Sequence, residues 1–178
     1  WVWYLLALHP EAEAKLHAEL DTVLGGRTPH FEDIAKLPYT RMVIDEAMRL
    51  YPPAHTLSRA ALGADEIGGH KVHKGSTVII APWVLHRHRL LWDAPLRFDP
   101  ERFTPERVAE RPRYAYLPFG AGPRICIGAA FAVTEAVLLL ATLASRFRLR
   151  LVPGHPIEPQ ALITLRPRYG IKVVVERR

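Results

Sequence analysis

The stretch FGAGPRICIG, residues 119–128, decides how the rest of this sequence is interpreted. It contains the only cysteine of the chain, Cys126, two residues after Arg124. Its glycines permit the backbone conformations of a tight loop, and the apolar run Ala129–Ser145 that follows predicts a helix. The sequence therefore places one thiol on a loop at the N-terminal end of a helix, where the helix dipole and the neighbouring guanidinium both favour a thiolate.

A lone thiolate restricts the chemistry of this loop. A structural zinc site needs four nitrogen or sulfur ligands, an internal disulfide needs a second cysteine, and a nucleophilic cysteine needs a histidine base, which the loop lacks. Two interpretations remain. Cys126 is either a buried free cysteine that packs as a small hydrophobic residue or the proximal thiolate ligand of a haem iron. In the second case Phe119 can cover the sulfur from solvent.

The spacing of the fixed residues in this stretch is specific. The pattern Phe119-x-x-Gly122-x-Arg124-x-Cys126-x-Gly128 resembles the haem-binding signature of the cytochrome P-450 family, the haem-thiolate monooxygenases. The resemblance implies that the cofactor is haem b and that Cys126 is its iron ligand. It also implies that four further residues of the loop bind the cofactor: Phe119, Gly120, Arg124 and Gly128.

A second motif lies on the predicted helix Pro38–Tyr51. Glu46 and Arg49 are three residues apart and therefore share one helix face, and their apolar neighbours predict that this face is buried. A buried ion pair needs further hydrogen bonds. The segment Glu46-x-x-Arg49 resembles the family's helix motif, and residues 100–103, PERF, resemble the segment that supplies its third member, Arg102. The resemblance implies a structural triad of Glu46, Arg49 and Arg102 beneath the cysteine loop.

The resemblance also assigns residues to the cofactor and substrate pocket. Arg59 is expected to pair with a haem propionate, because a buried carboxylate requires a charge-assisted partner; taken alone, Arg59 is typical of a surface charge at a strand edge. The implied substrate pocket contains Ala54, Thr56, Leu57, Leu162 and Ile163.

The cluster His86-Arg87-His88-Arg89 raises the question of a metal site. Its two histidines are two residues apart, which places them on opposite faces of a strand and far apart on a helix. We therefore interpret both as solvated loop histidines. The resemblance matches His86, Arg87 and Trp92 to a His-Arg pair and a downstream tryptophan of the family.

Periodicity and turn residues predict the remaining elements. Helical segments are expected at Trp1–Leu8, from Pro10 to Gly25-Gly26, at Phe31–Lys36 and at Pro82–His86. Strands are expected at His55–Leu62, Lys71–Val72, Thr77–Ala81 and Phe147–Val152. Leu162–Leu165 and Ile171–Val175 are expected to form a terminal hairpin, and Leu90–Pro118 is expected to lack regular structure.

Composition and charge set the broad class of the protein. The chain has 178 residues, of which 49% are hydrophobic and 24% charged, as in a globular domain. The net charge is +6, and several arginines lie in or before the cysteine loop: Arg102, Arg107, Arg111, Arg113 and Arg124. They form either a solvated surface or a basic face for an acidic electron donor such as a ferredoxin or flavin reductase, which we favour over nucleic acid.

Targeting signals are absent from the sequence in hand. No apolar stretch reaches the roughly 18 residues of a membrane span, and there is no signal peptide. A single cysteine fits a reducing compartment, so we expect the cytoplasm. A membrane anchor in a preceding segment stays open.

The chain opens at Trp1 inside an apolar run without a helix cap, which predicts a fragment. We therefore expect residues 1–178 to be a partial domain: the C-terminal portion of the cytochrome P-450 fold, mainly α with a smaller β region, with the N-terminal half absent. The implied activity is insertion of one oxygen atom from O2 into a small, apolar organic substrate. The resemblance implies that Trp1–Leu8 is the tail of the family's central helix, whose acid–threonine pair delivers protons to bound O2; that pair is not in this sequence. A non-enzymatic haem-thiolate binder or sensor and an inert truncated product are the alternatives.

Overall fold

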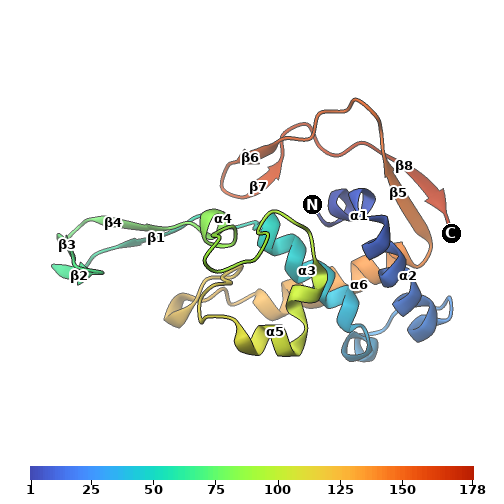
Figure 1. The fold of residues 1–178 in the computed structure, drawn as a ribbon, viewed down its shortest axis with the longest axis horizontal. Helices are drawn as coiled ribbons and strands as arrows, with labels where there is room; N and C mark the ends of the chain where they lie inside the picture. The colour runs from blue at the N-terminus through green and yellow to red at the C-terminus, as the bar shows by residue number, and fades with distance from the viewer.

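Helices form the body of the protein and short strands flank it. The computed structural model describes residues 1–178, and Figure 1 shows helices clustered together with strands above and to one side. Four helices share one hydrophobic core: α1 (Val2–Leu8), α2 (Pro10–Leu24), α3 (Pro38–Leu50) and α6 (Ala129–Ala144). This arrangement confirms the mainly α class. None of the helices has the length and apolar character needed to cross a membrane.

The ends of α2 and α3 follow from the sequence. Both helices begin at a proline, whose missing N–H has no partner in the first turn of a helix anyway. Gly25 ends α2 with φ of 56°, a left-handed conformation that favours glycine. Glu19 of α2 then caps α3, because its carboxylate accepts hydrogen bonds from the backbone N–H groups of Tyr39 at 2.6 Å and Thr40 at 2.8 Å.

The core is built from large apolar side chains on the facing sides of these helices. Leu16 and Leu20 of α2, Val43 of α3 and Val137 of α6 are almost completely buried. Each such side chain contributes about 1.5–3 kcal/mol relative to an exposed one. The packing of α3 between α2 and α6 fixes the helix that carries Glu46 and Arg49.

The segment between Leu90 and Pro118 contains more regular structure than expected. It holds the 3-10 helix η2 (Pro100–Phe103) and helix α5 (Pro105–Glu110), so the prediction of no regular structure was wrong there. Asp99 caps η2 by accepting from the N–H of Glu101 at 3.2 Å, and Thr104 caps α5 by accepting from the N–H of Arg107 at 3.5 Å. The prolines of this segment occupy first helical turns rather than interrupting helices.

Three shorter helical pieces complete the helical content. They are η1 (Phe31–Lys36), α4 (Pro82–Leu85) and η3 (Gly122–Arg124). The first two lie where the sequence predicted them, whereas η3 lies inside the cysteine loop.

Four short strands form an arm that projects from the helical body (Figure 1). Strand β1 (Leu57–Ala60) pairs antiparallel with β4 (Thr77–Ile80), with Leu57 opposite Ile80. Strand β2 (Asp65–Ile67) pairs with β3 (His70–Val72) farther out. The predicted strand 55–62 is shortened to β1. Strand β2 was not predicted: all its residues are exposed, so its sequence lacks the apolar alternation of a half-buried strand.

The C-terminal strands pair differently from the expectation. Strand β5 (Phe147–Leu151) pairs with β8 (Val173–Arg177), and β6 (Pro159–Ala161) pairs with β7 (Leu165–Pro167), so the predicted terminal hairpin was wrong. The β-branched run of β8 matches β5 in register, with Leu149 opposite Val175. The partner of β8 therefore comes from more than twenty residues away rather than from the adjacent segment.

Candidate functional site

The cysteine loop is closed by its own backbone hydrogen bonds. The N–H of Cys126 donates to the carbonyl of Phe119 at 3.0 Å, and the N–H of Ile125 donates to the carbonyl of Gly122 at 3.0 Å. Gly120 and Gly122 have φ of 74° and 71°, which other residues adopt only with strain. The two glycines therefore let the chain fold back, so that Cys126 lies just before the first turn of α6.

Cys126 is exposed, which excludes the interpretation as a buried structural cysteine. Apolar side chains beside it are exposed as well: Ile125 by 56%, Ile127 by 104% and Phe131 by 72%. Phe119 is half-buried and packs against the helical core, and its expected place over the sulfur stays a prediction. The thiol thus lies on an open apolar surface.

An apolar cavity of about 420 Å³ lies between α1, α3 and α6. Phe119 lines it from the cysteine loop, and Ala132, Val133 and Ala136 line it from the first turns of α6. All but one of its fifteen lining residues are hydrophobic, as in pockets for apolar groups. The cavity therefore adjoins the loop that presents Cys126, although Cys126 itself does not line it.

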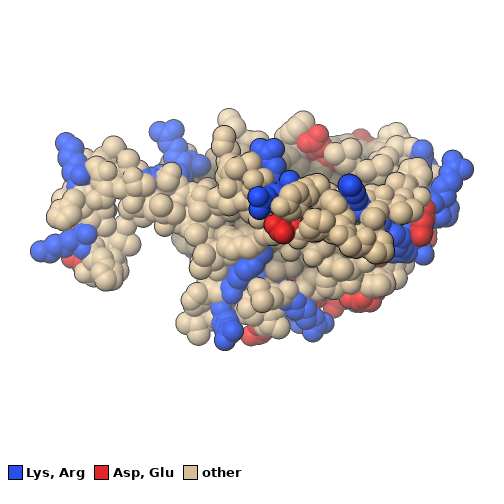
Figure 2. Space-filling model, turned by 90° about the horizontal axis from the view of Figure 1, so that it is seen from above, with Lys and Arg blue, Asp and Glu red and all other residues tan.

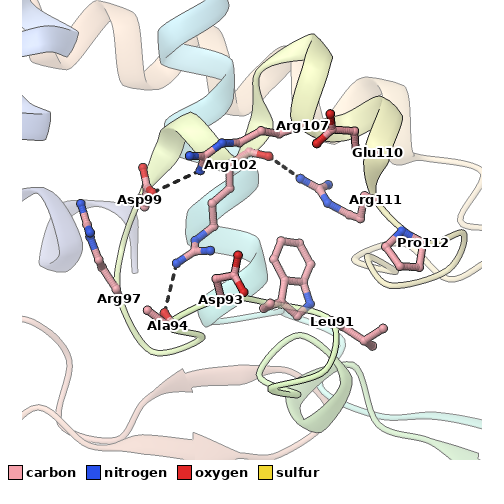
Figure 3. Close-up of a pocket in the computed structure, with 11 residues that line it drawn as sticks. Leu91, Asp93, Ala94, Arg97, Asp99, Arg102, Arg107, Glu110, Arg111 and Pro112 are labelled. Atoms are coloured by element: carbon pink, nitrogen blue, oxygen red, sulfur yellow. Dashed lines mark hydrogen bonds and ion pairs between the residues drawn. The ribbon is translucent and has the colours of Figure 1, made fainter.

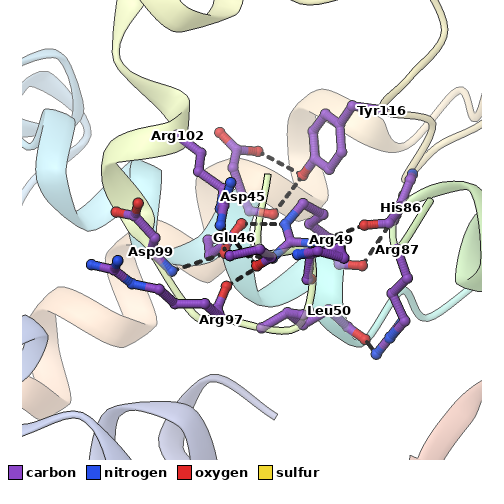
Figure 4. A network of polar contacts seen from close by, with 12 residues as sticks. Asp45, Glu46, Arg49, Leu50, His86, Arg87, Arg97, Asp99, Arg102 and Tyr116 are labelled. Carbon is purple, nitrogen blue, oxygen red and sulfur yellow. Dashed lines mark hydrogen bonds and ion pairs between the residues drawn. The ribbon is translucent and has the colours of Figure 1, made fainter. Parts of the chain in front are cut away.

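The structure brings Glu46, Arg49 and Arg102 together (Figure 4). Arg49 donates through Nε and Nη2 to the two carboxylate oxygens of Glu46, at 2.6 and 2.7 Å. Nε of Arg102 lies 3.5 Å from the Glu46 carboxylate. Burial raises the pKa of Glu46, and the hydrogen bonds from Arg49 oppose that effect. Both members of the central pair are completely buried, so its hydrogen bonds have no solvent competition.

Arg49 also connects α3 to the chain that leads toward the cysteine loop. Its Nη1 donates to the carbonyls of His86 and Pro95, each at 2.7 Å, and its Nη2 donates to the carbonyl of Arg97 at 3.0 Å. The N–H of Asp99 donates to Glu46 at 2.9 Å. The buried pair therefore holds the irregular segment between α4 and η2 through its backbone groups.

His86 is completely buried, so its interpretation as a solvated loop histidine was wrong. It accepts a hydrogen bond at Nε2 from the N–H of Leu117, at 2.8 Å. Its neighbour Arg87 packs over the ring of Trp83 at 3.4 Å and donates to the carbonyl of Leu50. His88 is exposed, as expected. Residues 86–89 alternate His and Arg, so no apolar pattern in the sequence predicts the burial of His86.

The histidines that the fold keeps neutral make its stability depend on pH. Burial lowers the pKa of His17 and of His86 to about 4 from an ordinary value of 6.5. The two imidazoles bind protons more readily in the unfolded chain than in the folded one. Their stabilisation of the fold is therefore complete above pH 6.5 and is lost as the pH falls toward 4. We expect the free energy of unfolding at pH 5 to lie below that at pH 7.5 by about 2 kcal/mol for each histidine.

Urea denaturation at the two pH values measures this difference. His17→Gln removes one of the two titrating groups and should roughly halve it. Equal stability of the wild-type protein at pH 5 and pH 7.5 would contradict the expectation.

Two of the five arginines near the loop, Arg102 and Arg111, are engaged inside the framework. Arg102 is buried, and Arg111 packs over Trp92 at 4.6 Å and Phe103 at 4.3 Å while donating to the carbonyl of Arg102 (Figure 3). Three of the five predicted residues remain exposed, namely Arg107, Arg113 and Arg124. Figure 2 shows cationic side chains spread over the surface with acidic residues among them.

The hollow beside Arg102 and Arg111 has a volume of about 430 Å³ (Figure 3). Arginines line it together with Asp93, Asp99 and Glu110, and Arg107 lies 3.6 Å from Asp99. The hollow is therefore lined by charges of both signs, four arginines and three carboxylates. This hollow belongs to the framework beneath the loop and not to an apolar ligand pocket.

The predicted pocket residues lie on two segments that the fold brings together. His55 donates from Nε2 to the carbonyl of Leu162, at 2.8 Å. A cavity of about 240 Å³ has Thr56 on one side and Ala161 and Leu165 on the other. Leu162 is 47% exposed and Ile163 96% exposed, at the turn between β6 and β7. Ala54 is half-buried in the segment before β1.

The arm places Arg59 on the strand that begins beside the cysteine loop. Leu57 lies at the start of β1, and one of its methyl groups is 3.6 Å from the position that a Cβ atom on Gly120 would occupy. Arg59 is exposed two residues farther along and donates to the carbonyl of Ser58 at 2.7 Å. Neither Arg59 nor Arg124 takes part in any of the ion pairs of the structure.

These residues fit a haem. An exposed thiol with apolar neighbours suits the iron and the apolar face of a macrocycle, and two guanidiniums without carboxylate partners suit its propionates. No group of three or more His, Cys, Asp or Glu residues lies close enough to hold a metal ion by itself.

Comparison with known proteins agrees with this geometry. The family model for cytochrome P450 matches residues 1–174. The chain is 48% identical over 165 residues to cyclooctatin synthase of Streptomyces melanosporofaciens. The aligned region covers 93% of this chain and 36% of that protein. It is 41% identical to pentalenene oxygenase of Streptomyces avermitilis, over 93% of this chain and 37% of that protein.

Solved structures show the same likeness. The haem domain of cytochrome P450DA superposes with a TM-score of 0.93 at 33% identity, over 99% of this chain and 39% of that structure. The chain thus spans less than two-fifths of the length of these relatives and matches a part of their fold. The match along nearly the whole sequence and the shared architecture establish that this chain belongs to the cytochrome P450 family.

Proposed function

We propose that this chain carries the haem-thiolate site of a monooxygenase. The observation that supports it best is the exposed Cys126, held on a closed loop before α6 and surrounded by exposed apolar side chains. Cys126 is the iron ligand in this proposal. When bound, the haem supplies activation of O2 with two electrons from a donor, so that one oxygen atom enters the substrate and the other leaves as water.

The residues of the chain bind and orient the cofactor. Phe119 and the backbone of Gly120 and Gly128 shape the loop around the thiolate. Arg124 and Arg59 bind the propionates, because neither guanidinium is paired with a carboxylate and a guanidinium can donate two parallel hydrogen bonds to one. Glu46, Arg49 and Arg102 hold the framework beneath the loop.

The substrate is a small apolar molecule in this proposal. Five residues contact it: Ala54, Thr56, Leu57, Leu162 and Ile163. Their apolar or weakly polar character and the name of the relative pentalenene oxygenase favour a hydrocarbon such as a terpene. The electron donor is an acidic ferredoxin or flavin reductase that meets the exposed arginines, and the compartment is the reducing cytoplasm.

Isotope labelling tests the reaction type. Haem-loaded protein is supplied with a ferredoxin, its reductase, pentalenene and ¹⁸O2, and the products are analysed by mass spectrometry. A monooxygenase yields a product that contains one ¹⁸O atom. Haem bound through the thiolate without labelled product would support the non-enzymatic haem binder instead.

Arg59 provides a second test, directed at cofactor binding. We expect Arg59→Gln to weaken haem affinity about 10- to 150-fold, because one charge-assisted contact contributes about 1.5–3 kcal/mol. Titration of haem followed by Soret absorbance measures the change. Lys71→Gln, on β3 of the same arm, is the control with the same change of charge. Equal affinities of the two variants would show that Arg59 does not hold a propionate.

A further inference from the structure

His86 lies between α3 and the segment that enters the cysteine loop. Its backbone carbonyl accepts from Nη1 of Arg49 at 2.7 Å, and its Nδ1 faces the backbone carbonyl of Arg49 at 3.3 Å. Its Nε2 accepts from the N–H of Leu117 at 2.8 Å (Figure 4 shows His86, Arg49 and Tyr116). The imidazole therefore connects the buried ion pair of α3 to the chain two residues before Phe119.

This arrangement determines the protonation state of the ring. Since Nε2 accepts a hydrogen bond it carries no proton, so the proton of the neutral ring is on Nδ1, directed at the carbonyl of Arg49. Burial lowers the pKa of His86 to about 4, and the cations Arg49 and Arg87 act in the same direction. At neutral pH the ring is therefore a neutral acceptor for Leu117.

The hydrogen bond at Leu117 continues into the loop. The carbonyl of Leu117 accepts from the N–H of Gly120 at 3.3 Å, and the carbonyl of Phe119 accepts from the N–H of Cys126 at 3.0 Å. The peptide units on both sides of Leu117 are thus fixed, one by His86 and the other by the turn that presents Phe119. The position of the Cys126 backbone depends on the carbonyl of Phe119.

A second contact holds the same segment from the other side. The hydroxyl of Tyr116 faces the backbone and side chain of Asp45 on α3, at 2.9 and 3.1 Å. The rings of Tyr116 and His86 pack with centroids 5.2 Å apart. Tyr116 is held through its side chain, whereas His86 accepts from a peptide N–H, so of these two contacts the one from His86 acts directly on the backbone that enters the loop.

We propose that His86 is a positioning residue for Cys126, which transmits the position of the Glu46–Arg49 pair to the thiolate loop through the N–H of Leu117. The proposal rests on the proposed function for the role of the thiolate. The hydrogen bond itself is a property of the chain and is measured without haem.

Nitrogen-15 NMR of the labelled wild-type protein tests the geometry directly. An N–H···N hydrogen bond between Leu117 and His86 gives a scalar coupling between the two nitrogens, and the ring shifts identify the tautomer with the proton on Nδ1. The expected result is a measurable coupling and that tautomer at pH 7. A proton on Nε2 and no coupling would overturn the proposal.

Variants then connect this hydrogen bond to the loop. His86→Phe keeps an aromatic ring but removes the acceptor, and His86→Gln places a carbonyl oxygen near the position of Nε2. We expect the amide hydrogens of Leu117 and Cys126 to exchange at least about tenfold faster in His86→Phe than in the wild type. In His86→Gln we expect exchange at the wild-type rate. His88→Phe, at the exposed histidine two residues away, is the matched control and should leave exchange unchanged.

The haem-loaded variants supply the second readout. The fraction of the ferrous–carbon monoxide complex with the thiolate-type Soret band is expected to fall in His86→Phe and to recover in His86→Gln. The proposal would be overturned if the Cys126 amide of a folded His86→Phe protein exchanged at the wild-type rate. It would also be overturned if the loop amides of a stable His86→Gln protein exchanged as fast as those of His86→Phe. No thiolate band in the wild type would contradict the proposed function alone, because the NMR coupling is independent of haem.

Discussion

Glu46→Gln is expected to lower the free energy of unfolding by about 3–5 kcal/mol. The variant keeps the size of the side chain but removes the carboxylate that pairs with both Arg49 and Arg102. Arg49 is completely buried, so its charge would remain in the core without a counter-ion. The loss also reaches the segment that Arg49 holds through the carbonyls of His86, Pro95 and Arg97.

Urea denaturation followed by far-UV circular dichroism measures this effect. Glu101→Gln is the matched control, because Glu101 is half-exposed and pairs with the exposed Lys15. Exposed pairs contribute about 1 kcal/mol or less. A change below about 1 kcal/mol in Glu46→Gln would show that the buried pair does not stabilise the framework.

Cys126→Ala is expected to weaken haem binding by more than about 100-fold, because the loss of a partner that only orients a metal ligand already costs 10–100-fold. The chain contains no other cysteine, so no second thiolate can replace the lost ligand. The electron paramagnetic resonance signal of thiolate-ligated ferric haem is expected to disappear in parallel.

Haem titration by Soret absorbance gives the affinities of the two proteins. Ser76→Ala is the control, since it makes the same kind of change to a methyl group between β3 and β4 on the arm, outside the cysteine loop. If Cys126→Ala bound haem as tightly as the wild type, the cofactor would be held elsewhere and the site assignment would be wrong.

The helical framework was predictable because its signals are local. Pro10 and Pro38 mark helix starts, Gly25 marks an end, and the apolar periodicity between them matches the helices of the core. The Glu46-x-x-Arg49 spacing placed both side chains on one face, and the structure shows them bonded to each other. Signals within one turn of helix are sufficient for such predictions.

The strand pairing was not predictable from local pattern. Strand β8 pairs with β5 rather than with the segment just before it, and register across a long connection depends on packing that no short stretch encodes.

The two helices between Leu90 and Pro118, in contrast, have start signals in the sequence. Asp99-Pro100-Glu101 and Thr104-Pro105-Glu106 each place a capping side chain, a first-turn proline and an acidic residue in order.

The site shows a similar division. The spacing around Cys126 and the glycines predicted a loop before a helix, whereas the exposure of the thiol and the inward position of Phe119 depend on how α1, α3 and α6 pack. The burial of His86 results from contacts with Arg49 and Leu117, both more than thirty residues away in the sequence. Distant partners of this kind are visible only in the folded chain.

The ferrous–carbon monoxide difference spectrum of the haem-supplied chain shows directly whether Cys126 is the iron ligand. We expect the red-shifted Soret band of a thiolate-ligated complex in the wild type and its absence in Cys126→Ala. Haem bound by the wild-type chain without that band, or the same band in both proteins, would contradict the assignment of Cys126 as the iron ligand.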